Sequence, residues 1–195
     1  MRKRPPKPED IAAAPRHNLK NQKVLSAKVV QQDLPDDADI SEEIPNEIKV
    51  AIASAVLAFS EMEMSAEHFI WDILGLSTDD GKLLTQIDTK EKFDKAKKLS
   101  ERYELPIHAN EKTAKEVWAS VKLIVEARNK IAHGVWRMID KTRPIVISYR
   151  IPIETGRINS EEFPLDRIKA IAVTSMKIKR LFDAMSVQVG LSKKL

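Results

Sequence analysis

The chain has 195 residues, a net charge of +4 and no cysteine. Its length is enough for one domain with a sizeable core, and the lack of cysteine excludes disulfides and thiolate metal sites. No stretch approaches the roughly 18 consecutive apolar residues that a membrane span needs. The N-terminus is charged but lacks the apolar segment of a signal peptide, so we expect a cytoplasmic protein with no membrane contact.

Residues 1–43 are expected to form a disordered tail that is basic at first and then acidic. Residues 1–28 contain eight Lys or Arg and two acidic residues, a net charge of +6, and an acidic stretch follows. Prolines interrupt the segment, and no apolar periodicity persists in it. The basic part could contact nucleic-acid phosphates, act as a solubilising tail, or fold back on the acidic stretch. No aromatic residue is interleaved for stacking on bases, which favours the last two roles.

Residues 44–195 are expected to form one domain, an all-α bundle of four to five helices. The chain has only five glycines, and its apolar residues recur at helical spacing. After Gly134 the pattern changes to period two, which predicts a β-hairpin inserted before the last helix. The predicted elements are a helix over Asn46 to about Leu74, a short helical piece near Lys82–Ile87, a helix from Thr89 to about Tyr103, a helix over Glu111–His133, hairpin strands over Val135–Asp140 and Ile145–Ile151, and a helix from Pro164 to about Val189.

Arg128 interrupts the apolar stripe of the helix over Glu111–His133. At about 100° per residue it falls near the centre of an arc of apolar side chains, namely Val117, Val121, Ile124, Val125, Ile131 and Ala132. An arginine in such a seam costs free energy unless a partner takes its charge. Glu63 interrupts the stripe of the first long helix in the same way, with Glu67 beside it. We therefore expect Glu63 or Glu67 to pair with Arg128 across the bundle; the alternative is that these glutamates lie at a wet edge.

His133 lies in the last turn of the same helix, just before a glycine that is typical of a helix C-terminus. One interpretation of His133 is structural: a cation at the negative end of the helix dipole. Asn129 is its neighbour one turn earlier. On an ideal helix Arg128 and His133 do not share a face. Contact between them requires the arginine side chain to reach round the helix, or the last turn to unwind.

Arginine, asparagine and histidine together suit chemistry on a phosphodiester. Histidine can give or take a proton near neutral pH, and arginine binds phosphate oxygens. In RNA the 2′-hydroxyl is a built-in nucleophile, so an acid, a base and a phosphate clamp suffice, and we expect neither a metal nor a cofactor. One such histidine per chain supplies an acid or a base, and two copies facing each other in a symmetric homodimer supply both. The apolar seam containing Arg128 would then be partly a dimer interface.

The run Arg128-Asn129-Lys130-Ile131-Ala132-His133-Gly134 resembles the motif of the HEPN superfamily (higher eukaryote and prokaryote nucleotide-binding domains). That motif has an arginine, a polar residue such as asparagine, a short spacer and a histidine, near the end of a bundle helix. The resemblance could cover about residues 44–190. It implies an all-α bundle that dimerises with its motifs together and, in many members, metal-independent endoribonuclease activity in toxin–antitoxin or anti-phage systems. By matching position, the catalytic set would be Arg128, Asn129 and His133; Glu63 and Glu67 are not part of the resemblance.

The sequence thus predicts an endoribonuclease that acts on RNA as a homodimer, with an antitoxin protein as a further partner. His133 is expected to be the general acid or base, Arg128 to bind the scissile phosphate, and Asn129 to position the ring or the RNA. The alternative is a non-catalytic module that binds RNA, a nucleotide or a protein and uses Arg128–Glu63 as a structural ion pair. A third hypothesis, an accessory protein of RNA modification or nucleotidyl transfer, is neither supported nor excluded by the sequence.

Overall fold

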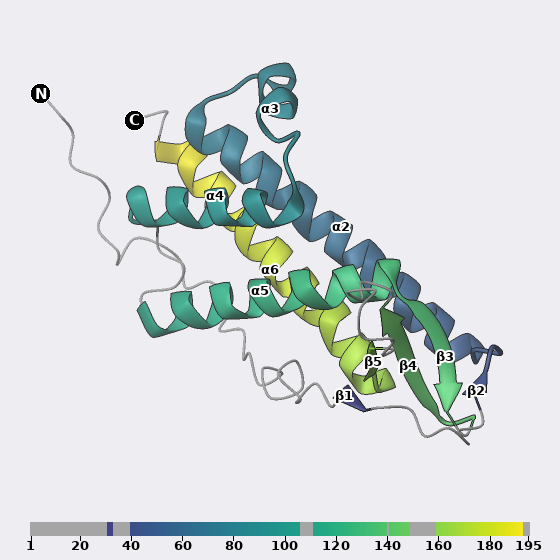
Figure 1. Cartoon of the computed structure of the whole chain (residues 1–195). Coiled ribbons are helices and arrows are strands. Elements are labelled where there is room, and N and C mark those ends of the chain that lie inside the picture. The colour runs from purple at the N-terminus through teal and green to yellow at the C-terminus, as the bar shows by residue number, and fades with distance from the viewer. Residues whose placement is uncertain (1–30, 33–39, 106–110, 140, 149–158, 193–195) are drawn as a thin grey trace, which may run out of the picture.

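The described part of the chain consists of five helices and five short strands (Figure 1). The computed structural model describes residues 31–32, 40–105, 111–139, 141–148 and 159–192. The helices are α2 (Asn46–Leu74), α3 (Thr78–Leu84), α4 (Thr89–Arg102), α5 (Glu111–His133) and α6 (Leu165–Ser192). The strands are β1 (Gln31–Gln32), β2 (Ile40–Ser41), β3 (Val135–Ile139), β4 (Arg143–Ser148) and β5 (Asn159–Glu162). The predicted fold class, a helical bundle with a β-hairpin before the last helix, is confirmed.

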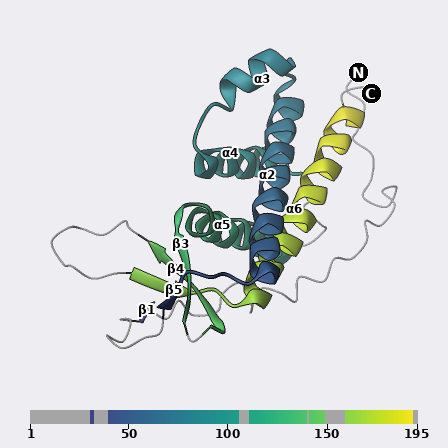
Figure 2. The same cartoon turned by 90° about the vertical axis from the view of Figure 1, so that its right-hand side faces the viewer.

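Helices α2 and α6 form the central pair of the bundle. They lie side by side, and α4 and α5 pack across one side of the pair (Figures 1 and 2). The largest fully buried side chains lie in this core, among them Phe59, Phe69, Ile124 and Phe182. Burial of such apolar surface, at about 25 cal/mol per Å², is the main stabilising contribution. None of the described helices is both long and apolar enough to cross a membrane.

Local capping explains where the first helices begin and end. α2 follows Pro45 and ends at Gly75, whose φ of 68° is the left-handed conformation that glycine adopts at least cost. The side chain of Ser77 then accepts a hydrogen bond from the backbone N–H of Asp80 and starts α3. The prediction of a short helix near Lys82–Ile87 was therefore wrong in its boundaries, because it overlooked this capping serine.

The sheet is larger than the predicted hairpin. Its strand order is β1-β5-β4-β3-β2, with every neighbouring pair antiparallel. β3 and β4 are the predicted hairpin, whereas the two-residue strands β1 and β2 lie within residues 1–43, where no strand was predicted. Strands of two to four residues are too short for an alternating pattern to show, and pairing with a neighbouring strand defines them. The basic segment 1–28 lies outside the described residues.

The two faces of the sheet have different surroundings. Met138 and Val146 lie on the face toward the helices and belong to the core of the bundle. The other face carries a separate small cluster made of Ile139, Ile145 and Ile147. Because only Gly134 separates α5 from β3, the sheet lies beside the last turn of α5 (Figure 1). That turn carries the predicted site residues.

Candidate functional site

The predicted site residues lie on the outer side of the last turn of α5. The helix stays regular through His133, and the N–H of Gly134 donates to the carbonyl oxygen of Lys130 at 2.8 Å. Arg128 is half-buried, whereas Asn129 and His133 are exposed. The site is thus at the surface, where a ligand can reach the imidazole and the end of the guanidinium.

The structure brings the three side chains of the motif together. Arg128 Nη1 lies 3.5 Å from His133 Nε2, and it donates a hydrogen bond to Asn129 Oδ1 at 3.3 Å. The arginine side chain reaches round the helix, so the last turn does not need to unwind. Because a guanidinium has donors and no acceptor, Nε2 of His133 is the acceptor in a hydrogen bond between these two groups.

Arg128 is accommodated in the apolar seam by an aromatic ring. Its Cζ lies 5.3 Å from the centroid of the Phe59 ring on α2, a distance at which a cation is attracted to the π face. Its Nε is buried and has no hydrogen-bond partner among the described residues. No carboxylate among these described residues forms an ion pair with Arg128. The inner part of the guanidinium therefore packs on Phe59, while Nη1 faces the motif.

The predicted pairing of Arg128 with Glu63 or Glu67 was wrong. Both glutamates pair with Lys92 of α4, at 2.9 Å from Glu63 and 2.5 Å from Glu67. Thr89 also donates to Glu63 at 2.9 Å. The expectation failed because the periodicity of α2 shows that Glu63 lies in a buried stripe but not which neighbouring helix that part of the stripe faces.

We call Lys92, Glu63 and Glu67 the Lys92 cluster. Burial lowers the pKa of Lys92, but the hydrogen bonds and charges of Glu67 and Glu63 outweigh burial and raise the pKa above its ordinary value of 10.5. The ammonium therefore stays protonated at neutral pH. The Lys92 cluster joins α2 to α4.

A second cluster lies beside the motif and was not predicted. Glu161 of β5 accepts hydrogen bonds from Lys130, which is within the motif, and from Arg167 in the first turn of α6 at 2.7 Å. The side chains of Glu161 and Arg167 are 8% and 9% exposed. We call these three residues the Glu161 cluster. A cation in a first helical turn is disfavoured by the helix dipole, so Arg167 was the signal in the sequence for a nearby carboxylate.

The arrangement of Arg128 and His133 has the parts required for acid–base chemistry on a phosphate. His133 is exposed, and an imidazole is a side chain that can act as a general acid or base. The neighbouring guanidinium lacks a carboxylate partner in the described part of the chain, so its charge is available to phosphate oxygens. The side-chain amide of Asn129 can form hydrogen bonds with the imidazole of His133 or with a bound phosphate. No group of three or more His, Asp and Glu side chains that could hold a metal ion occurs among the described residues.

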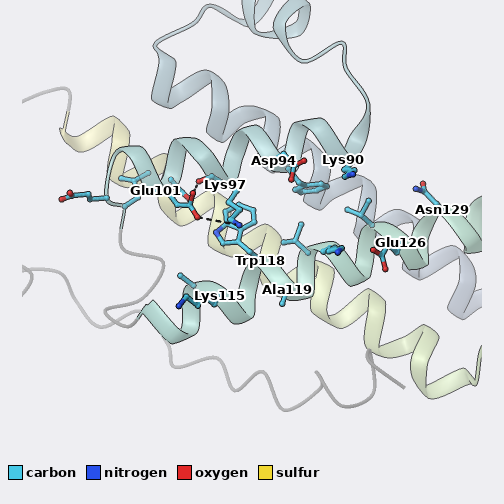
Figure 3. A pocket seen from close by; sticks show the side chains of 17 residues that line it. Lys90, Asp94, Lys97, Glu101, Lys115, Trp118, Ala119, Glu126 and Asn129 are labelled. Carbon is cyan, nitrogen blue, oxygen red and sulfur yellow. Dashed lines mark hydrogen bonds and ion pairs between the residues drawn. The ribbon is translucent and has the colours of Figure 1, made fainter. Parts of the chain in front are cut away.

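A groove between α4 and α5 ends at the motif (Figure 3). Its volume is about 1310 Å³, and Asn129 lines it at one end. Apolar side chains including Phe93, Trp118 and Val125 line part of it, and four lysines and four acidic residues make the remainder electrically balanced. A ligand lying in the groove would reach Asn129, but the groove itself carries no excess positive charge for RNA.

Comparison with protein-family models, with curated proteins and with solved structures found no match. The resemblance to the HEPN superfamily therefore depends on the residues of the motif and on their position near the end of a bundle helix. The contact between Arg128 and His133 is a separate observation, because sequence spacing on an ideal helix did not require it.

Proposed function

We propose that the protein is a HEPN-like endoribonuclease that cleaves RNA in the cytoplasm without a metal ion. The supporting observation is the approach of Arg128 Nη1 to His133 Nε2 at 3.5 Å on an accessible turn. The guanidinium is held by Phe59 from within and has no carboxylate partner among the described residues. This pair offers a proton acceptor and a phosphate-binding cation side by side.

In the proposed reaction, phosphate oxygens of the RNA draw Arg128 Nη1 away from His133. Nε2, which accepts that contact in the free protein, then takes the proton of the 2′-hydroxyl. The 2′-oxygen attacks phosphorus, and the bond from phosphorus to the 5′-oxygen breaks while that oxygen takes up a proton from an acid. The products are a 2′,3′-cyclic phosphate and a 5′-hydroxyl, and Asn129 positions the imidazole or the RNA.

The acid comes from the second copy of the chain in the proposed homodimer. The apolar seam that was expected to form part of the dimer interface is unsuited to that role, because Val121, Ile124 and Ile131 are buried within the chain itself. The exposed residues of the last turn, Asn129, Ala132 and His133, are the surface through which two motifs can meet. An antitoxin protein that covers this surface would block both dimer formation and access of RNA.

A second function has an observation in its favour. The groove between α4 and α5 contains equal numbers of lysines and acidic residues around an apolar lining. Such a surface suits an amphipathic protein segment better than a polyanion, whose binding depends on excess positive charge. The alternative proposal is a non-catalytic module that binds a protein partner there.

The test is cleavage of RNA by the purified protein in EDTA, with end-group analysis of the products. We expect 2′,3′-cyclic phosphate ends from the wild type and loss of cleavage in folded His133→Ala. His68→Ala is the matched control, because His68 is an exposed histidine on α2 that packs against Trp71 at a ring distance of 4.9 Å. Absence of cleavage by the wild type across varied RNAs, or equal cleavage by His133→Ala, contradicts the nuclease and favours the binding module.

A further inference from the structure

Two contacts at consecutive residues hold the last turn of α5 against the sheet. Lys130 and Ile131 lie between Asn129 and Ala132 in the sequence. The side chain of Lys130 and the carbonyl group of Ile131 are each bound to a residue of the sheet. The outward side chains and the inward contacts therefore share a single turn of helix.

The first contact is the Glu161 cluster. Lys130 donates to Glu161, and Arg167 Nη1 donates to the other carboxylate oxygen at 2.7 Å. One carboxylate thus ties α5 to β5 and to the start of α6. Because Glu161 and Arg167 are almost fully buried, solvent weakens the bond between them little, whereas Lys130 is 35% exposed.

The second contact is made by Trp136, the second residue of β3. Its Nε1 donates to the carbonyl oxygen of Ile131 at 3.1 Å. The last carbonyl groups of a helix lack partners within the helix, and this bond satisfies one of them. The Trp136 ring meets Phe163 edge-on at 5.9 Å, and Arg167 Cζ lies 4.2 Å from the Phe163 centroid. Phe163 and Arg167 therefore connect the two contacts.

We infer that Glu161 and Trp136 are positioning residues for the Arg128–His133 pair; this inference rests on the proposed function. The last turn of a helix frays readily, since few hydrogen bonds hold it. Arg128 and His133 are only 3.5 Å apart through an exposed contact, which cannot hold the turn by itself. Glu161 acts through Lys130 and Trp136 acts through Ile131, and together they fix the backbone from which the outward side chains project. Neither residue touches the RNA.

The first experiment compares Trp136→Phe with Trp71→Phe. Each substitution removes one indole N–H hydrogen bond and keeps an aromatic ring, because Trp71 Nε1 donates to Thr85 at 3.3 Å near the far end of α2. Amide hydrogen exchange is followed across α5, and kcat and KM are measured for RNA cleavage. We expect Trp136→Phe to speed exchange in the last turn of α5 and to lower kcat by about tenfold to a hundredfold with little change in KM. Trp71→Phe should change neither the last turn nor kcat.

The second experiment compares Glu161→Gln with Lys92→Gln, which neutralise the central residue of each charged cluster. We expect only Glu161→Gln to loosen the last turn of α5 and lower kcat. If Glu161→Gln does not fold, Trp136→Phe still decides the question. Unchanged exchange in the last turn, or faster exchange with full activity, overturns the positioning role.

Failure of the proposed function can be told apart from failure of this inference. If the wild type cleaves no RNA, the ring signal of His133 is followed by NMR, assigned among the four histidines by its absence in His133→Ala. A signal that shifts in Trp136→Phe and stays in place in Trp71→Phe supports the positioning of His133. A signal that is the same in both variants overturns it.

Discussion

The bundle contains two clusters of three charged side chains that differ in charge order and in burial. The Lys92 cluster places one lysine between two glutamates, and the Glu161 cluster places one glutamate between a lysine and an arginine. Glu161 and Arg167 are 8% and 9% exposed, whereas Lys92 and Glu63 are 13% and 17% exposed. Lys130, the third residue of the Glu161 cluster, is 35% exposed. Since an unpaired charge costs more the deeper it lies, the Glu161–Arg167 pair should be the more sensitive to loss of a partner.

The two clusters also hold different parts of the molecule. The Lys92 cluster joins two helices of the bundle, whereas the Glu161 cluster includes a residue of the motif itself. The effect of an ion cluster on function therefore depends on which helix or turn it holds in place. A cluster joined to the turn that carries the proposed catalytic residues should affect both stability and activity, and a cluster between two supporting helices should affect stability alone.

The largest difference is expected when one carboxylate is removed from each cluster. Glu161→Ala leaves Arg167 buried without its partner, and we expect the free energy of unfolding to fall by about 3–5 kcal/mol. Glu63→Ala leaves Lys92 paired with Glu67, and we expect a loss of about 1 kcal/mol. Urea unfolding of both variants measures the two losses. Equal losses would show that the difference in burial between the clusters has no energetic consequence.

The packing beside the Glu161 cluster can be tested at Gly134. A Cβ at this position would overlap the side chain of Val146 and lie 2.6 Å from the carbonyl oxygen of Lys130. We expect Gly134→Ala to destabilise the fold by about 1–3 kcal/mol because the sheet and the helix end would have to move apart. Gly190→Ala is the control, since nothing lies within 4 Å of its Cβ, and it should stabilise α6 by about 0.5–1 kcal/mol. A neutral Gly134→Ala in thermal and urea unfolding would contradict the tight contact.

The Lys92 cluster predicts a loss of stability at alkaline pH. The pKa of Lys92 is raised above 10.5 in the folded protein, so its contribution is fully present below the unfolded pKa and is lost as pH rises through the folded value. We expect the difference in unfolding free energy between the wild type and Lys92→Met to be constant up to about pH 9 and to shrink above about pH 10.5. A constant difference across this range would mean that the charge on Lys92 does not stabilise the fold.

A small effect on stability is expected at Arg128. If Glu63 were its partner, Arg128→Ala would leave a buried charge unpaired and cost about 3–5 kcal/mol. Because Glu63 pairs with Lys92 and Arg128 packs on Phe59, we expect a loss of about 1 kcal/mol together with loss of RNA cleavage. Denaturation and cleavage assays on the same preparation separate the two effects. A loss of several kcal/mol would restore a structural role for the arginine.

Much of the fold could be predicted from the sequence because its helices are long and periodic. α2 has the predicted limits, Asn46 and Leu74, and α5 ends at His133 as its following glycine indicated. The hairpin was visible in the change of period after Gly134. β1, β2 and β5 were not predicted, because strands this short depend on pairing with residues distant in the sequence.

The candidate site was predicted in its residues but not in its contacts. The spacing of Arg128, Asn129 and His133 identified a turn with an unusual arginine, and the structure adds the 3.5 Å contact that places two of the side chains together. Ala132 was expected on the apolar arc and is exposed. The sequence did not predict the hydrogen bond from Lys130 to Glu161 of β5, which Arg167 of α6 also binds.

The sequence by itself determined the class of the fold, the helix that carries the motif and the residues of the motif. Helical periodicity is a local property, with a repeat of about 3.6 residues, so one chain segment suffices to reveal a buried stripe. Only the tertiary structure decided the interaction partner of each buried or half-buried charged side chain. It assigned Glu63 to Lys92, Arg128 to Phe59 and Lys130 to Glu161, because an ion pair requires two segments to approach within about 4 Å and periodicity within one helix does not specify its neighbour.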